Sequence, residues 1–278
     1  PVYFLFISVV IFGVHGLSSL LEEKGNGASL IAMYFLILPN LAMSGFGSIQ
    51  FIPHLWSIGV EEQFYLIWPL ILKFFKKKGI ITIMVLLVLV IPVIPHACDF
   101  IAVRFPDYER ACEIVRLFFE YFLINVMAIG GLLALLFDRY LDVLKRVFNK
   151  KLLYIIIGSV LLLWFSGVNF AFFNDIIYSF AFGLLILASS VAPPIFIFEN
   201  KIVSYLGKIS YGVYTYHWLI AFFVLTFFRE WLFDANFIFG YALIVGFTIL
   251  VSVLSYELFE KKILKLKGEY ALIKSGRV

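Results

Sequence analysis

A row of polar side chains interrupts a long apolar stretch of the sequence. On an α-helix each residue advances about 100°, so His54, Ser57, Glu61 and Tyr65 fall within about 80° of one another, while Glu62 points about 100° away from Glu61. One face would then carry an imidazole, a hydroxyl, a carboxylate and a phenol in line. Such groups exchange protons with a substrate or orient it. The stripe therefore predicts a general acid/base or substrate-positioning site.

Glu61 is the most costly member of this stripe if the helix lies in a membrane. A charge near the centre of a bilayer costs about 2.5–3.5 kcal/mol, and it is tolerated where it faces protein or water. Two interpretations stay open. Glu61 is either a buried carboxylate satisfied by neighbouring helices, or a group that works on a substrate.

The composition indicates that this helix does lie in a membrane. Of the 278 residues, 63% are hydrophobic, and the mean hydropathy is +1.02, whereas soluble domains are about 45–50% apolar. At about 20 residues per span, the chain is long enough for a bundle of eight or nine segments. We expect an all-α polytopic bundle in a single domain over residues 1–267, followed by a tail over 268–278.

Apolar runs separated by charged or Pro- and Gly-containing intervals give the expected segments. The predicted spans are residues 2–21, 55–75, 79–95, 113–137, 152–166, 176–198, 211–228 and 238–258. Residues 30–46 contain Pro39-Asn40 and Gly45, so this segment is either a full span or a re-entrant one, and we favour the re-entrant form. Between the spans we expect an outer loop at 96–112, a basic loop at 138–151 and an amphipathic connector at 199–210.

The basic residues give an orientation. Most of the 22 lysines and arginines lie in the intervals after residues 75, 137 and 198 and in the tail. The positive-inside rule places these intervals and the C-terminus in the cytoplasm, and the 96–112 loop outside. The net charge of +4 therefore reflects the orientation of the chain in the membrane and does not indicate nucleic-acid binding. The sequence contains no Cys/His cluster that would predict a metal site.

The polar stripe also carries a resemblance. The pattern H-x-W-S-[LI]-x-x-E-x-x-F-Y, with His54, Trp56, Ser57, Glu61 and Tyr65 in register, resembles the signature of the acyltransferase-3 family of bacterial membrane O-acyltransferases.

A second match, over residues 208–218, is similar to the family's late motif S-Y-G-[IV]-Y-x-Y-H-W. There Ser210, Tyr214 and His217 share a helical face. These residues form either an aromatic belt at the membrane boundary or part of a packing or acyl-donor site. Near the end, Glu260 matches the family's closing motif, whereas Lys262 stands where proline is expected.

The resemblance also implies a membrane topology and a set of catalytic residues. It implies a ten-helix plan with both termini cytoplasmic, of which this chain would hold helices three to ten. The family's first helix carries an arginine and a histidine held to be catalytic, and neither has a counterpart here. We therefore expect a chain that is incomplete at its N-terminus, in which Glu61, Ser57, Tyr65 and His54 support catalysis.

Further candidates lie outside these motifs. Arg116 and Glu120, four residues apart, predict a local ion pair or a substrate contact. The predicted substrate-binding residues are Trp56, Tyr214, His217, Arg116 and Glu120. Cys98 and Cys112, the two cysteines of the chain, fall in the predicted outer loop and are either a disulfide or two unpaired thiols. A bridge there would close a loop of about 15 residues, for which about 3 kcal/mol is typical.

The predicted function is transfer of an acyl group, most simply acetyl, from cytoplasmic acyl-CoA to a hydroxyl of a surface or lipid-linked polysaccharide. The protein would work in the bacterial inner membrane, with the lipid bilayer and a glycan as its partners. The alternatives are a transporter or glycolipid flippase, because charged and broken helices also mark transport paths, and a non-catalytic remnant of the acyltransferase fold.

Overall fold

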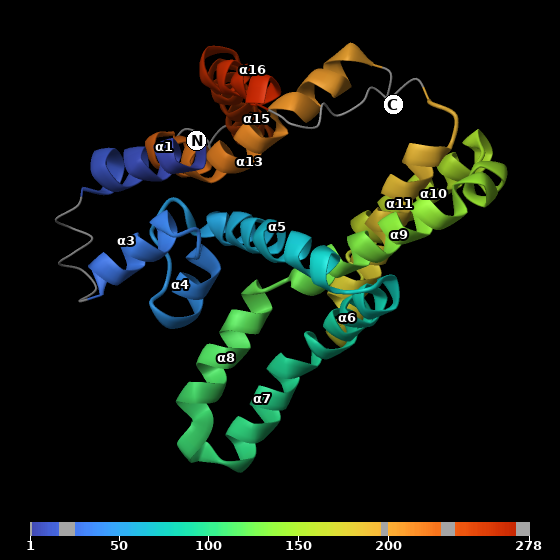
Figure 1. The fold of residues 1–278 in the computed structure, drawn as a ribbon. Helices are drawn as coiled ribbons and strands as arrows, with labels where there is room; N and C mark the ends of the chain where they lie inside the picture. Colours follow the sequence, from blue (N-terminus) through green and yellow to red (C-terminus); the bar gives the residue numbers. More distant parts are fainter. Residues whose placement is uncertain (1, 17–25, 196–199, 229–236, 271–278) are drawn as a thin grey trace. The chain divides into compact units, whose positions relative to one another are not determined.

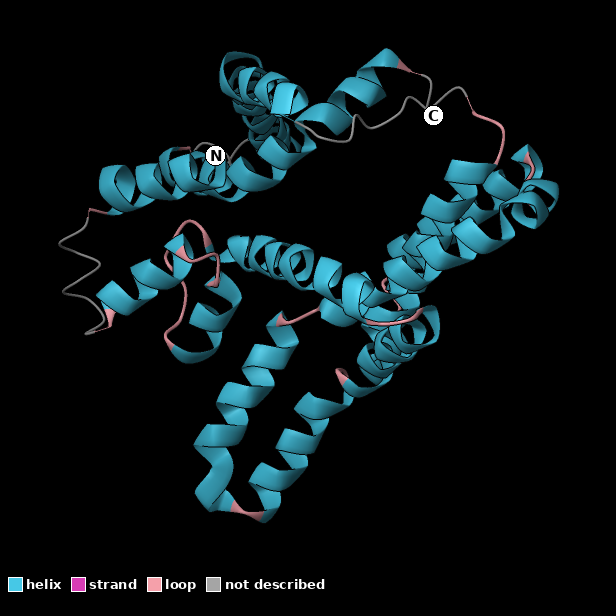
Figure 2. Cartoon of the chain, viewed as in Figure 1, coloured by secondary structure: helices cyan, strands magenta, loops and turns pink. Residues whose placement is uncertain are grey.

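The computed structural model describes residues 2–16, 26–195, 200–228 and 237–270. These residues form helices joined by short loops, with no strand among them (Figure 2), which confirms the all-α prediction for this part of the chain. The chain divides into two compact units. The first comprises Pro1–Gly27, Ile49–His54 and Ile197–Val278, and the second comprises Ala28–Ser48 and Leu55–Phe196. The predicted single domain over 1–267 stays a prediction, and most of the 268–278 tail lies outside the described residues.

The first unit combines the start of the chain with its last helices. Its elements are α1 (Val2–Ser8), the π-helix η1 (Val9–His15), most of the 3-10 turn η2 (Pro53–Leu55), α13 (Lys201–Phe227), α15 (Phe237–Ser255), the π-helix η5 (Tyr256–Glu260) and α16 (Lys261–Tyr270). The helices α13 and α15 pack against each other (Figure 1). They approach closely at Gly212, where a Cβ atom would lie 3.2 Å from the Cβ of Ser252.

The second unit contains the helices of the middle of the chain. Its elements are α3 (Gly27–Phe35), α4 (Pro39–Gly45), α5 (Trp56–Phe74), α6 (Lys77–Val90), α7 (Val93–Arg104), the 3-10 turn η3 (Pro106–Tyr108), α8 (Glu109–Tyr121), α9 (Ile124–Val147), α10 (Lys150–Ser166), the 3-10 turn η4 (Ala171–Phe173) and α11 (Asn174–Val191). The helices α9, α10 and α11 lie side by side, and α7 and α8 form a hairpin (Figure 1).

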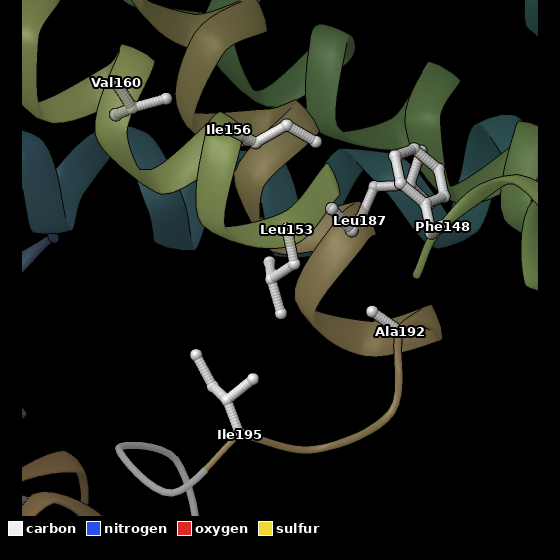
Figure 3. Packing of buried hydrophobic residues seen from close by; sticks show 8 residues of the cluster. Phe148, Leu153, Ile156, Val160, Leu187, Ala192 and Ile195 are labelled. Atoms are coloured by element: carbon white, nitrogen blue, oxygen red, sulfur yellow. The ribbon is translucent and has the colours of Figure 1, made fainter. Parts of the chain in front are cut away.

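An apolar cluster holds α9, α10 and α11 together. Leu153, Ile156 and Val160 recur at spacings of three and four, so they lie on one face of α10. This face packs with Leu187 of α11 and with Phe148, which follows α9 (Figure 3). A second cluster joins Met84 and its neighbours on α6 to α9, and Trp68 and Ile71 of α5 pack against it. The C-terminal half of α5 is therefore fixed by apolar packing.

The N-terminal half of α5 is fixed by the segment predicted to be broken. Residues 36–38 separate α3 from α4, and Ile37 has a positive φ of 61°. Gln63 of α5 donates from Nε2 to Asn40 Oδ1 at 2.8 Å, and Asn40 donates from Nδ2 to Gln63 Oε1 at 3.2 Å. This reciprocal amide pair satisfies the buried Asn40 side chain and ties α4 to α5.

Two predicted loops are wrong because they are largely helical. The predicted outer loop 96–112 is occupied by α7 and α8, with a turn only at 105–108. The basic loop 138–151 is mostly the end of α9. The amphipathic connector expected at 199–210 is helical from Lys201 on and forms the first part of α13. The predicted span 113–137 is interrupted at 122–123, where α8 ends and α9 begins. Charged residues at these positions are compatible with helices that continue beyond the apolar part of a span, which hydropathy alone does not distinguish from loops.

The structure supports a membrane protein with fewer clear spans than predicted. Among the described residues, four helical stretches are long and apolar enough to cross a membrane: Pro106–Val147, Asn174–Val191, Lys201–Phe227 and Ile238–Leu266. The pair α6 and α7, bent by 41°, makes a fifth. Eight spans are not confirmed, since α5 carries three charges, α10 has 17 residues and α3 and α4 are short.

The contact between α4 and α5 gives a test of this packing. A Cβ atom at Gly59 would lie 2.8 Å from Pro39 Cδ and 3.1 Å from Asn40 Oδ1. We expect Gly59→Ala to lower the free energy of unfolding by about 1–3 kcal/mol through overpacking, measured by thermal unfolding in detergent. Gly158→Ala in α10 is the control, because a Cβ there meets nothing within 4 Å. Equal losses in the two variants would contradict the assigned contact.

Candidate functional site

His54 is the centre of a hydrogen-bonded cluster in the first unit. Its side chain is buried, with 9% of the residue exposed. The Nε2 atom donates to the backbone carbonyl of Thr215 at 3.1 Å, and the hydroxyl of Tyr214 donates to the backbone carbonyl of His54 at 2.6 Å. These two bonds join the 3-10 turn to the middle of α13, across 161 and 160 positions of sequence.

His217 places a second imidazole beside the first. The ring centroids of His54 and His217 are 4.8 Å apart, with an edge-on angle of 65°. The Nδ1 atom of His217 donates to the carbonyl of Tyr214 at 2.6 Å. Trp218 stacks on the His54 ring at 6.3 Å. The cluster therefore consists of two imidazoles, a phenol and an indole, all from α13 and the turn.

The partners of the two rings define their tautomers. A carbonyl oxygen only accepts, so neutral His54 carries its proton on Nε2 and neutral His217 carries its proton on Nδ1. The basic nitrogens are then Nδ1 of His54 and Nε2 of His217. A histidine whose tautomer is fixed by a backbone carbonyl is arranged as in general base catalysis.

Burial keeps His54 neutral. Its pKa is lowered from 6.5 to about 4, first by loss of hydration and then by the positive charge that His217 can carry. The hydrogen bond to Thr215 opposes this shift and is the smaller effect. Of the two imidazoles, His217 is the less buried. Chemically, the arrangement offers an accessible imidazole, His217, supported by a buried neutral one.

His54 lies outside the α-helix that carries Ser57, Glu61 and Tyr65. His54 lies in a 3-10 turn, and the α-helix begins only at Trp56, so the step of 100° per residue does not extend back to His54. The imidazole makes its contacts with α13 instead.

The other stripe residues lie on α5, as predicted, in the second unit. Ser57, Glu61 and Tyr65 are four residues apart in succession and so share a face. Glu61 is exposed and Tyr65 is 56% exposed, whereas the opposite face of the helix carries Gly59 and packs on α4. Glu61 is thus not a carboxylate buried against helices of the described chain, and its role stays a prediction.

The remaining predicted residues are dispersed. Trp56 packs edge-on against Tyr121 of α8, with ring centroids 5.4 Å apart. Arg116 donates to Glu120 at 2.6 Å, which confirms the predicted ion pair, and its Nε lies 3.6 Å from Asp99 Oδ1. The guanidinium is therefore already engaged by two carboxylates of its own hairpin. Substrate binding by Trp56, Arg116 and Glu120 stays a prediction.

Of the three late-motif residues expected to share a face, two lie at the cluster. Tyr214 and His217 both contact His54, whereas the hydroxyl of Ser210 donates to the carbonyl of Gly207 at 2.9 Å, one turn back on α13. The interpretation of Tyr214 and His217 as only an aromatic belt is weakened, because both make specific polar contacts.

The π-helical turn η5 explains the position of Glu260. Ser255 donates to Glu260 Oε1 at 2.9 Å, and the hydroxyls of Ser255 and Tyr216 are 2.8 Å apart. Residues five apart diverge by about 140° on an α-helix, and the wider turn of a π-helix brings them closer to one face. The turn therefore joins the closing motif to α13 through a chain of three side chains.

Two polar contacts escaped sequence analysis. The Asn40–Gln63 pair was signalled only by amides within apolar segments. The carbonyl of Thr215 has no signal in the sequence, because every residue has a carbonyl.

Comparisons with known proteins match most of the chain. The acyltransferase-3 family, described as an acyltransferase domain, matches residues 2–257. O-acetyltransferase OatA of Staphylococcus aureus strain NCTC 8325 / PS 47 is 25% identical over 256 residues, covering 84% of this chain and 40% of that protein. Peptidoglycan O-acetyltransferase OatA of Listeria monocytogenes is 24% identical over 251 residues, covering 79% and 37%. The chain thus spans about two fifths of the length of these relatives. No solved structure matches it.

The lowered pKa of His54 predicts how stability depends on pH. Between pH 6.5 and 4 the unfolded chain binds a proton at His54, whereas the folded chain does not. The free energy of unfolding therefore falls as the pH drops through this window. We expect His54→Gln to flatten the pH dependence of the melting temperature in this range, and the exposed His96→Gln to preserve it. An unchanged slope in His54→Gln would show that His54 titrates normally.

Proposed function

Because the chain belongs to the acyltransferase-3 family, we propose that it takes part in transferring an acetyl group to a hydroxyl of a cell-envelope glycan. The names of its relatives support acetyl as the acyl group, and one of them is named for peptidoglycan. The proposed donor is cytoplasmic acetyl-CoA, as the family resemblance implies. The proposed location is the bacterial inner membrane with the C-terminus in the cytoplasm, supported by the apolar helices and the basic tail.

The observation that carries the proposal is the meeting of the two family motifs at the imidazole pair. His54 comes from the early motif and His217 from the late one, and their rings are 4.8 Å apart. O-acyl transfer needs a base that removes the proton of the acceptor hydroxyl as its oxygen attacks the acyl carbon. His217 is the proposed base, since Nδ1 is committed to the Tyr214 carbonyl and Nε2 remains basic.

His54 and Tyr214 are the proposed positioning residues. The Tyr214 carbonyl accepts from the His217 imidazole and the Tyr214 hydroxyl donates to the backbone carbonyl of His54, so Tyr214 bonds to both histidines. Neutral His54 packs against His217 without adding a second positive charge when His217 takes up the proton. The α5 stripe of Ser57, Glu61 and Tyr65 is the proposed second group of polar side chains, which would bind the acceptor or accept protons.

Replacement of His217 tests the proposed base. We expect His217→Gln to lower the kcat of acetyl transfer about 10²-fold or more with little change in KM, because general base catalysis contributes about 10²–10⁴-fold. The assay supplies radiolabelled acetyl-CoA and glycan acceptor to membranes that contain the full chain. His96→Gln is the control. Retention of the full rate by His217→Gln would assign the base elsewhere, and no transfer by the unmodified protein would contradict the function itself.

Replacement of Glu61 tests the role of the α5 stripe, and the adjacent Glu62 provides a matched control. If Glu61 handles protons, Glu61→Gln lowers the rate of the same reaction by about 10²-fold. Glu62→Gln, one residue along and about 100° around the helix, should keep most of the rate. Equal rates in the two variants would remove Glu61 from the mechanism.

A further inference from the structure

The hairpin of α7 and α8 contains the two cysteines of the chain (Figure 1). Cys98 lies on α7 and Cys112 on α8, and they are 7% and 9% exposed. Of all the residues in α7, η3 and α8, these two alone are buried. The interior of the hairpin is therefore made by two thiols, in place of the leucines and isoleucines that usually hold two helices together.

The register of the hairpin brings the two side chains together. Both cysteines line one cavity of about 260 Å³, and both are buried. The contact between Arg116 Nε and Asp99 Oδ1, at 3.6 Å, crosses between the same two helices next to the cysteines. In the structure both sulfurs are free thiols.

The ion pairs of this hairpin add little stability. Its ion pairs, Arg116 with Asp99 and with Glu120, involve carboxylates that are 61% and 43% exposed, and exposed ion pairs contribute little. Small structures that lack an apolar core are commonly held by disulfides. A covalent link at the one buried contact would supply what the packing lacks.

We propose that Cys98 and Cys112 form an intramolecular disulfide that closes the α7–α8 hairpin on the outer side of the membrane. One S–S bond forms and two S–H bonds break. The two protons and two electrons pass to the disulfide of an extracytoplasmic thiol–disulfide oxidoreductase, whose S–S bond breaks to give two thiols. Oxidation takes place during folding, before the hairpin buries the sulfurs. Disulfides persist in oxidising compartments, so the bond requires the outer location that the basic residues predict. This proposal is independent of acetyl transfer.

Sequential thiol labelling tests the bond in the full chain. Membranes from cells are denatured with N-ethylmaleimide, which blocks free thiols, and are then reduced and treated with a maleimide-linked polyethylene glycol. We expect two added polymers per chain after reduction and none when reduction is omitted. Peptide mass spectrometry should find the Cys98 and Cys112 peptides linked. Cys98→Ser and Cys112→Ser are the controls, and each should acquire no polymer, because its remaining thiol is blocked at the first step.

Two outcomes would overturn the proposal. The first is blocking of both cysteines of the unmodified chain by N-ethylmaleimide before reduction. The second is a disulfide-linked dimer on a non-reducing gel in place of the internal bond. As a second measurement, a reductant should lower the melting temperature of the unmodified protein and leave that of the Cys98→Ala/Cys112→Ala variant unchanged. An equal effect on both proteins would also contradict the bond.

Discussion

The buried hydrogen bond from His54 to the carbonyl of Thr215 is the constraint on which the candidate site depends. It is 3.1 Å long and joins residues 161 positions apart. By taking the proton of Nε2, it fixes the tautomer of His54 and turns the ring toward α13, where His217 lies against it. Burial of the same ring keeps it uncharged, since its pKa falls to about 4. One hydrogen bond to the backbone thus brings together two family motifs that are far apart in the sequence.

The surrounding helices hold α13 in the orientation that this bond requires. Gly212 lets α13 approach α15 closely at Ser252, and Thr215 is fully buried one turn further along. The chain from Tyr216 through Ser255 to Glu260 makes a second attachment, which exists because η5 is a π-helix. π-Helical turns within α-helices are frequent at functional sites. The closing motif of the family therefore has a structural role here, in that it fixes the helix that carries the imidazole.

Hydropathy and the helical period correctly predicted the features of the fold that depend on neighbouring residues in the sequence. The all-α fold, the helices around residues 152–166 and 238–258, the broken segment near Pro39 and the Arg116–Glu120 pair follow from neighbouring residues. Helices with charged ends, such as α7, α8 and the end of α9, were missed because their polar residues also suit loops. The environment of His54 could not be predicted, since a 3-10 turn replaces the expected helix and its partner is a backbone carbonyl. The membership of both histidines in family motifs pointed to the site, and only the structure brought the two rings together.

The most direct test of the account is the coupling between the two imidazoles in acetyl transfer. Rates with radiolabelled acetyl-CoA and glycan acceptor are compared for His54→Gln, His217→Gln and the double variant. If the pair acts as one unit, the double variant loses about as much activity as the more damaging single variant, because groups that act together are not additive. Losses that multiply in the double variant would show that His54 and His217 act independently, and would contradict a shared site built on the bond to Thr215.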